Sequence, residues 1–267
     1  MPGIAVVGNL SRDLVDGEPP RPGGPPYWAA RALRALGARA LVVAKCADDD
    51  RKLFSPALVA LGLPVLWRPG ESTATYAFHY EGDHRVMEVL ETGDTWTPED
   101  VQGLGGARWV HVGALAQSDF PAETMAELAN GRRVSLDGQG LVRPARTGPL
   151  ELDAGYDPEV LRHVTILKLA EEEAEALLGG EPTEEALRAL GVPEVLVTFG
   201  SLGSLVLASG RLERVEARAI DGDADPTGAG DAFSAAYLVA RSAGHVPVAA
   251  ARKASGLVAG MLGGQLR

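Results

Sequence analysis

The chain has 267 residues, 46% hydrophobic and 23% charged, so it is long enough to bury a large core without disulfide or metal staples. Its net charge of −11 argues against nucleic acid and anionic membranes as main partners. The single cysteine, Cys46, excludes an internal disulfide, and the sequence has no signal peptide and no apolar run of about 20 residues. Together these features predict a cytoplasmic protein.

The first part of the chain alternates buried strands with helices. Strands are predicted over 4–8, 40–44 and 65–67, and helices over 27–36 and 54–61. Residues 17–26 are too rich in Pro and Gly for the interior of any element. The order β-α-β-α-β predicts a parallel sheet with helices on both faces.

The pattern then changes to that of an antiparallel hairpin. Residues 73–80 alternate small or polar side chains with bulky ones, and 85–90 form a second short strand after a Gly-containing turn at 81–84. We expect this hairpin to be a small lid on the main sheet, formed by about 70–92 together with 12–24.

The lid leads to a prediction about assembly. A lone hairpin is marginal in water, and Tyr76, Phe78 and Tyr80 give this one a bulky face. That face must cover either a pocket of the same chain or the hairpin of a second subunit. Because the alternation favours one buried face, we predict a homodimer joined through the lids.

The strand–helix alternation resumes near residue 109 and continues to the C-terminus. Strands are predicted over 109–112, 134–137, 164–167 and 195–199, helices over 121–128, 170–178 and 184–190, and a second hairpin over 205–207 and 213–216. Two long Ala-rich helices, near 228–243 and 247–262, close the chain. This order predicts a single α/β domain over residues 1–267 with a mostly parallel central sheet.

Several common catalytic motifs are missing from the sequence. None of the four lysines follows Gly, which excludes a P-loop, and no H-E-x-x-H, C-x-x-C or G-x-S-x-G is present. No G-x-G-x-x-G follows the first strand, so a dinucleotide-binding fold is not favoured.

The nonapeptide D-P-T-G-A-G-D-A-F, which contains Asp231, carries the strongest chemical signal. Pro226 and Gly228 predict a turn, and Thr227 is placed to cap the helix that follows. Gly228 and Gly230 leave backbone N–H groups uncovered at the helix start, which forms an anion site. Asp231 adds a carboxylate suited to a general base beside a transferring phosphate. Gly-rich helix starts with an acidic first turn are also common without any such site.

This nonapeptide resembles the C-terminal signature of the PfkB, or ribokinase-like, carbohydrate kinases. Further similarities follow in the family's order and cover nearly the whole chain: G-N-L-S-R-D over 8–13, P-G-G over 22–24, K-L-A-E-E-E over 168–173 and T-F-G-S-L-G over 198–203. The resemblance implies the family's fold, a three-layer α/β/α sandwich with a mostly parallel central sheet and a small β lid.

The resemblance also implies a role for each matching residue. Asp231 resembles the catalytic base, and the N–H groups of Gly228, Ala229 and Gly230 resemble the anion hole for the γ-phosphoryl group. The other implied roles are substrate binding by Asp13, Gly23 and Gly24, nucleotide binding by Thr198, Gly200, Gly203 and Lys168, and ordering of Mg²⁺ through water by Glu173. Three alternatives are structural: an ordinary loop for Asp13, a β-turn for Gly200 and Gly203, and a solvated helix face for Glu173.

The activity implied by the resemblance is ATP-dependent transfer of the γ-phosphate to a hydroxyl group of a sugar, a polyol or cyclitol, or a nucleoside. ATP and Mg²⁺ are the implied cofactors, and a monovalent cation is allowed. Residues 43–46 and 135–143 resemble the short, myo-inositol-kinase-like branch of the family. Two other functions stay open: a pyridoxal or hydroxymethylpyrimidine kinase, and a catalytically inactive sugar-binding protein of the same fold.

The sequence departs from the family pattern in three places. Ala170 stands where the family usually has Asn, which removes a polar group near the metal and phosphates. Residues 47–50 lack the glycines of the family's G-x-D-x-x-G stretch, and the chain is short, with a Pro-rich lid segment around 14–22. The first departure leads us to expect that Glu173 carries more of the Mg²⁺ ordering.

Overall fold

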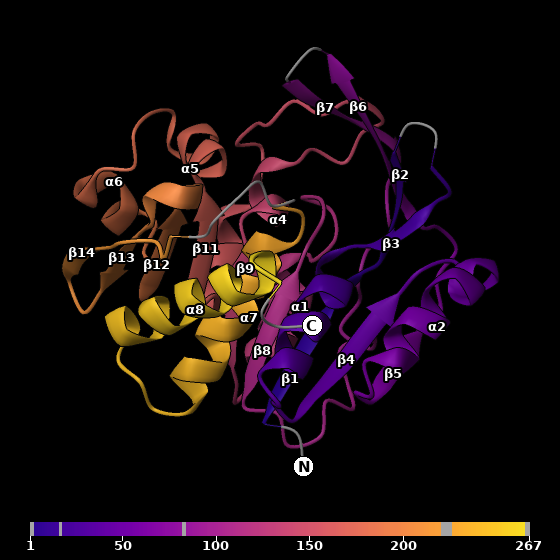
Figure 1. The fold of residues 1–267 in the computed structure, drawn as a ribbon, viewed down its shortest axis with the longest axis horizontal. Coiled ribbons are helices and arrows are strands. Elements are labelled where there is room, and N and C mark those ends of the chain that lie inside the picture. The colour runs from indigo at the N-terminus through magenta and orange to yellow at the C-terminus, as the bar shows by residue number, and fades with distance from the viewer. Residues whose placement is uncertain (1–2, 16–17, 82–83, 220–225, 265–267) are drawn as a thin grey trace.

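The computed structural model describes residues 3–15, 18–81, 84–219 and 226–264, which form two β-sheets and their covering helices (Figure 1). The larger sheet has nine strands in the order β14-β13-β12-β11-β9-β8-β1-β4-β5. These strands are β1 (Ile4–Asn9), β4 (Ala40–Lys45), β5 (Val65–Arg68), β8 (Trp109–Gly113), β9 (Arg133–Asp137), β11 (Ile166–Ala170), β12 (Glu194–Thr198), β13 (Ser204–Ala208) and β14 (Arg211–Val215). Neighbouring strands are parallel, except that β13 is antiparallel to both of its neighbours, β12 and β14.

Helices cover both faces of this sheet. One face carries α1 (Pro25–Ala35), α2 (Arg51–Ala60), α7 (Ala229–Ser242) and α8 (Pro247–Leu262), and the other carries α3 (Ala122–Ala129), α4 (Gln139–Val142), α5 (Glu171–Leu178) and α6 (Glu184–Ala189). Alternate residues of a strand point to opposite faces. Accordingly, Ile4 and Val6 belong to the apolar cluster that contains residues of α1 and α7, whereas Ala5 and Val7 belong to the cluster that contains residues of α3 and α5. The predicted three-layer α/β/α architecture is confirmed.

The second sheet has five strands in the order β10-β7-β6-β2-β3. It contains β2 (Ser11–Val15), β3 (Arg21–Gly23), the hairpin β6 (Ala74–Glu81) and β7 (His84–Glu91), and β10 (Gly148–Pro149). Residues 82–83 of the expected turn lie outside the described residues. Tyr76 and Phe78 are 4% and 6% exposed and pack with Val89 and Leu115, so the hairpin buries one face within its own chain.

Two expectations for the course of the chain are wrong. Residues 17–26 were expected to lie outside any element interior, yet Arg21–Gly23 is strand β3 and α1 begins at Pro25. Proline is tolerated there because β3 is an edge strand and because the first N–H groups of a helix have no partner within it. The strand expected at 164–167 lies at Ile166–Ala170, because the charged Lys168 is a buried strand residue.

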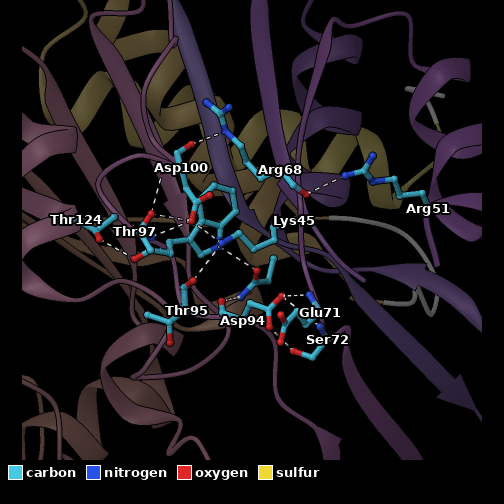
Figure 2. A network of polar contacts seen from close by, with 12 residues as sticks. Lys45, Arg51, Arg68, Glu71, Ser72, Asp94, Thr95, Thr97, Asp100 and Thr124 are labelled. Carbon is cyan, nitrogen blue, oxygen red and sulfur yellow. Dashed lines mark hydrogen bonds and ion pairs between the residues drawn. The ribbon is translucent and has the colours of Figure 1, made fainter. Parts of the chain in front are cut away.

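The connections between the hairpin and the main sheet are fixed by Asp94 (Figure 2). Its carboxylate accepts hydrogen bonds from the N–H of Glu71 at 2.7 Å, and from the N–H and Oγ of Ser72 at 3.2 and 2.8 Å. Its carbonyl accepts one from Nδ2 of Asn9 at 2.9 Å, and Oδ1 of Asn9 accepts one from Nε1 of Trp96 at 2.9 Å. The chain segments entering and leaving the hairpin are therefore tied to each other and to the carboxyl end of β1.

Lys45, at the carboxyl end of β4, supports the same connection (Figure 2). Its Nζ donates to the carbonyl of Thr95 at 3.1 Å and to Oδ2 of Asp100 at 2.6 Å, and lies 4.9 Å from the ring centroid of Trp96. Burial works against the charge of Asp100, but the hydrogen bond from Lys45 and those from Thr97 outweigh it and lower the Asp100 pKa. The carboxylate therefore stays ionised at neutral pH.

Replacing Asp94 tests this anchoring. We expect Asp94→Ala to lower the free energy of unfolding by about 1–3 kcal/mol, because three donors lose their shared acceptor. Urea unfolding followed by circular dichroism measures the change. The control is Asp49→Ala, which removes an exposed carboxylate; equal effects of the two substitutions would show that Asp94 anchors nothing.

Candidate functional site

A cavity of about 180 Å³ lies where the second sheet meets the start of α7. The second sheet contributes Asp13, Tyr76, Phe78 and Met87 to its lining, and the start of α7 contributes Gly228 and Asp231, among others. The structure thus brings the predicted base into one cavity with Asp13 and Gly24, which were predicted to bind substrate. These residues are far apart in sequence and meet because parallel strands end at the same edge of the sheet.

The start of α7 makes two close approaches to neighbouring side chains at glycine residues. Gly228 is the N-cap, with a φ of +77°, and a Cβ there would lie 2.4 Å from the Trp28 ring. A Cβ on Gly230 would lie 2.9 Å from Nζ of Lys168. The glycines therefore bring the helix start down onto Trp28 and Lys168, as well as leaving its N–H groups uncovered.

The cap and the anion hole differ in detail from the prediction. Thr227 was predicted to cap α7, but the N-cap is Gly228 and no side chain caps it; Asp225, at the head of the nonapeptide, lies outside the described residues. The N–H of Ala229 donates to the carbonyl of Pro226 at 2.9 Å, so it is already engaged. Within the described chain, the N–H groups of Gly228 and Gly230 have no acceptor and remain able to bind an anion.

One buried lysine lies among the acidic residues of the site. Nζ of Lys168 is 3.5 Å from Oδ2 of Asp137 and 4.0 Å from Oε2 of Glu173, and Lys168 is 3% exposed. Burial alone would lower the Lys168 pKa, but the carboxylates of Asp137, Glu173 and Asp231 outweigh it and raise the pKa. Lys168 is therefore a permanent cation beneath the start of α7.

Asp231 has the properties of a base that works at neutral pH. Burial raises its pKa first, the carboxylate of Asp137 adds to the increase, and Lys168 and Arg143 oppose it, giving a pKa of about 7. Its Oδ1 is buried and has no hydrogen-bond partner among the described residues. A carboxylate in this state can accept a proton from a group placed in the cavity.

Two residues of the site were not predicted from the sequence. Asp137 ends the buried strand β9, and its Oδ2 also lies 3.5 Å from Oγ of Ser234. Arg143 lines the cavity, and its Nε is buried without an acceptor among the described residues. A carboxylate that directly follows a buried run at the carboxyl edge of a parallel sheet was the available signal for Asp137. Arg143 had no such signal of its own, although both residues lie in the segment 135–143 that resembles the myo-inositol-kinase-like branch.

The predicted nucleotide-side residues lie outside this cavity. Thr198 ends β12, and its Oγ1 donates to the carbonyl of Leu169 at 3.2 Å. Gly200 starts a 3₁₀ turn, and a Cβ on Gly203 would lie 2.2 Å from the carbonyl of Val215. The β-turn alternative therefore accounts for both glycines, and their nucleotide role stays a prediction, as does that of Lys168.

Glu173 and Gly23 have structural roles within the site. Oε2 of Glu173 accepts a hydrogen bond from the N–H of Ala170 at 2.7 Å, and Glu173 is 4% exposed. The alternative of a solvated acid on a helix face is therefore wrong. Gly23 leaves room for the carboxylate of Asp13, which a Cβ would approach to 2.2 Å, and Oγ of Ser11 donates to Oδ1 of Asp13 at 2.7 Å.

Comparison with known proteins places this chain in a family. Residues 18–262 match the pfkB family carbohydrate kinases. A ribokinase from Bacillus subtilis (strain 168) is 29% identical over 96% of this chain and 91% of its own length. A cytidine kinase from Thermococcus kodakarensis is 28% identical over 91% of this chain and 89% of its own length.

The fold leads to the same group of proteins. A solved structure of a pyrophosphate-dependent kinase in the ribokinase family, complexed with a pyrophosphate analogue and myo-inositol, matches with a TM-score of 0.84 at 25% identity, covering 97% of this chain and 94% of that one. The fold is therefore the ribokinase-like α/β fold. Because the family match covers residues 18–262, which is most of the chain, the chain belongs to the pfkB family of carbohydrate kinases.

Proposed function

We propose that this protein transfers a phosphoryl group to a hydroxyl group of a small polyol or sugar, with Asp231 as the general base. The observation that carries the proposal is a buried carboxylate with a pKa of about 7 in a cavity, next to uncommitted N–H groups at a helix start. An inactive sugar-binding protein would have no need of such a carboxylate, whose burial is costly.

Each step of the proposed reaction uses a residue of the cavity. Asp13, held by Ser11, binds hydroxyl groups of the acceptor. Asp231 accepts the proton of the attacking hydroxyl as its oxygen bonds to phosphorus; the bond from that phosphorus to the donor's bridging oxygen breaks, and ADP leaves from ATP, or phosphate from pyrophosphate. The N–H groups of Gly228 and Gly230 and the guanidinium of Arg143 stabilise the charge on the transferring group. Ala229 would join them only after releasing the carbonyl of Pro226.

The acceptor proposed is a compact one. The cavity volume of about 180 Å³ is below the ~300–1,000 Å³ of drug-sized ligand sites, which favours a cyclitol or monosaccharide over a nucleoside. Myo-inositol is bound in the pyrophosphate-dependent relative. Trp28 and Phe78 supply apolar walls and Asp13 a polar one, which suits a ring with an apolar face and a rim of hydroxyl groups.

ATP is the proposed phosphoryl donor, and pyrophosphate is the second candidate. Pyrophosphate is favoured by Arg143, a partly free guanidinium in the cavity that suits phosphate oxygens. The relative with bound myo-inositol is described as pyrophosphate-dependent.

Mg²⁺ fits the residues of the site as an ion held through water. Asp137, Glu173 and Asp231 are buried carboxylates with hard oxygen donors, and Lys168 pairs with only part of their charge. Among the described residues, no group of three or more acidic, His or Cys side chains could hold a metal directly. We propose that Glu173 orders Mg²⁺ through water, where the ion would neutralise phosphate charge.

The homodimer joined through the lids is a proposal. Tyr76 and Phe78 of the aromatic face that predicted it line the cavity of their own chain, and the side chain of Tyr80 lies outside what the structure describes. A dimer through the lids would use the outer face of the hairpin, where Leu90 is 44% exposed. The cytoplasmic location and the single-domain organisation stay predictions, and a monovalent cation is not assigned to any residue. No helix in the described part of the chain is long and apolar enough to cross a membrane.

A donor and acceptor panel tests the proposed function. ATP and pyrophosphate are each combined with myo-inositol, ribose, fructose, cytidine and pyridoxal, and phosphorylated product is detected by ³¹P NMR. We expect product with a cyclitol or monosaccharide from at least one donor. Transfer to pyridoxal alone, or no transfer to any acceptor, would contradict the proposal.

Replacing the base tests its role. We expect Asp231→Asn to lower kcat by at least ~10²-fold, because the hydroxyl loses its proton acceptor, while the affinity for the phosphoryl donor stays nearly unchanged. Steady-state kinetics and donor titration measure the two effects. Asp49→Asn is the control on an exposed carboxylate, and near-full turnover of Asp231→Asn would remove Asp231 from the mechanism.

The Mg²⁺ proposal is tested at Glu173 and Ala170. We expect Glu173→Gln to raise the Mg²⁺ concentration that gives half-maximal rate, because one carboxylate charge is lost. We expect Ala170→Asn to lower it, because Ala170 lies at the N-cap of α5 beside Glu173 and Asn adds a polar oxygen there. A midpoint that neither substitution moves would show that these positions do not order the ion.

A further inference from the structure

A second and larger cavity lies at the other end of the main sheet from Asp231. Its volume is about 660 Å³, and four of its eight lining residues are arginines: Arg108, Arg132, Arg133 and Arg241. β9 begins at this cavity with Arg133 and ends at Asp137, whose carboxylate acts on the pKa of Asp231. Asp231 and Arg241 lie near opposite ends of α7, roughly 15 Å apart along the helix axis. The two cavities are therefore distinct.

The contacts of the arginines leave most of their charge unpaired. Arg241 is neutralised by Glu194, with 2.6 Å between Nη2 and Oε1. Nη1 of Arg132 donates only to backbone carbonyls, those of Glu127 at 3.3 Å and Asn130 at 3.5 Å. Carbonyls hold the guanidinium in place but do not cancel its charge.

Arg108 and Arg133 are exposed at the mouth of the cavity. The guanidinium carbon of Arg133 lies 4.8 Å from the ring centroid of Trp109, which also lines the cavity. Within the described residues, no carboxylate pairs with Arg108, Arg132 or Arg133. Three like charges thus face one cavity in a chain whose net charge is −11, an arrangement that an anion would stabilise.

The shape of the cavity suits a small molecule. Its volume falls within the ~300–1,000 Å³ that is usual for ligand sites. Gly131 and Gly244 line it with φ of +70° and +90°, and the space where a Cβ would stand is open at both. The two chain turns at the rim therefore leave access from solvent.

The lining also selects the chemistry of the ligand. Guanidinium groups bind phosphate oxygens through paired hydrogen bonds, and three unpaired guanidinium groups match more than one phosphate. Trp109 is only 7% exposed and lies under Arg133, so it offers no free face on which a nucleobase could stack. We propose that this cavity binds a small molecule carrying two or more phosphate groups, recognised through those groups.

Calorimetric titration of the full chain with inorganic tripolyphosphate tests the proposal. We expect a saturable binding event whose dissociation constant rises at least ~10-fold in the double variant Arg108→Gln/Arg133→Gln. The matched control is Arg162→Gln/Arg252→Gln, which removes two exposed arginines elsewhere, and it should leave the event unchanged. Arg143→Gln, in the Asp231 cavity, should also leave it unchanged, which separates the two cavities.

Two outcomes would overturn the proposal. One is the absence of saturable binding to the unmodified chain. The other is an equal loss of affinity in the cavity variant and its matched control, which would mean attraction by overall charge alone. Circular dichroism verifies that each variant is folded, and Arg108→Gln alone provides a second test, because Arg108 has no side-chain partner among the described residues.

Discussion

A single buried ammonium group, that of Lys168, is the interaction on which the site depends. It lies 3.5 Å from Asp137 and 4.0 Å from Glu173, and directly beneath Gly230 of α7. Its charge offsets that of the carboxylates, which could not otherwise be buried together at this edge of the sheet. One cation cannot fully compensate three acidic groups, and the excess negative charge contributes to the raised pKa of Asp231.

The same cluster fixes where the reacting groups lie. Gly228 and Gly230 let α7 approach Trp28 and Lys168, so Asp231 enters the cavity at a helix start where two N–H groups have no acceptor among the described residues. The second sheet closes the cavity from the opposite side with Tyr76 and Phe78. Asp94, Asn9 and Lys45 hold that sheet's connections to the carboxyl ends of β1 and β4. The contacts that anchor the second sheet and the glycines that place Asp231 therefore both shape the same cavity.

Much of this arrangement was predictable from local patterns. The parts that were not predicted were missed for physical reasons. The apolar runs of β1, β4 and β8 and the alternation of β6 and β7 reflect burial periodicity, which a sequence displays directly. The start of α7 was recognisable because its chemistry is confined to a few adjacent residues. Strand β3 was missed because prolines suit an edge strand as well as a loop.

Long-range pairing was the part that local patterns could not supply. Lys168 is charged, and only its spatial neighbours Asp137 and Glu173 explain why it lies inside a strand. Arg143 lines the cavity at the end of the short helix α4, which the sequence periodicity did not predict. The arginines of the second cavity come from three separate segments, at 108, 132–133 and 241, and meet only in the folded chain. Asp137, which pairs with Lys168, is likewise far from it in sequence.

The central claim, that burial beside Lys168 leaves Asp231 with a pKa near 7, is tested most directly by the pH dependence of stability. Because the pKa of Asp231 is higher in the folded than in the unfolded state, its protonation stabilises the folded state at low pH. This contribution to the free energy of unfolding is lost as the pH rises from about 4 to 7. The comparison is between the unmodified chain and Asp231→Asn, unfolded by urea at pH 5 and pH 8. The account predicts that the variant gains stability relative to the unmodified chain by about 2–3 kcal/mol over that interval. A stability difference independent of pH, or one that changes in the opposite direction, would contradict it.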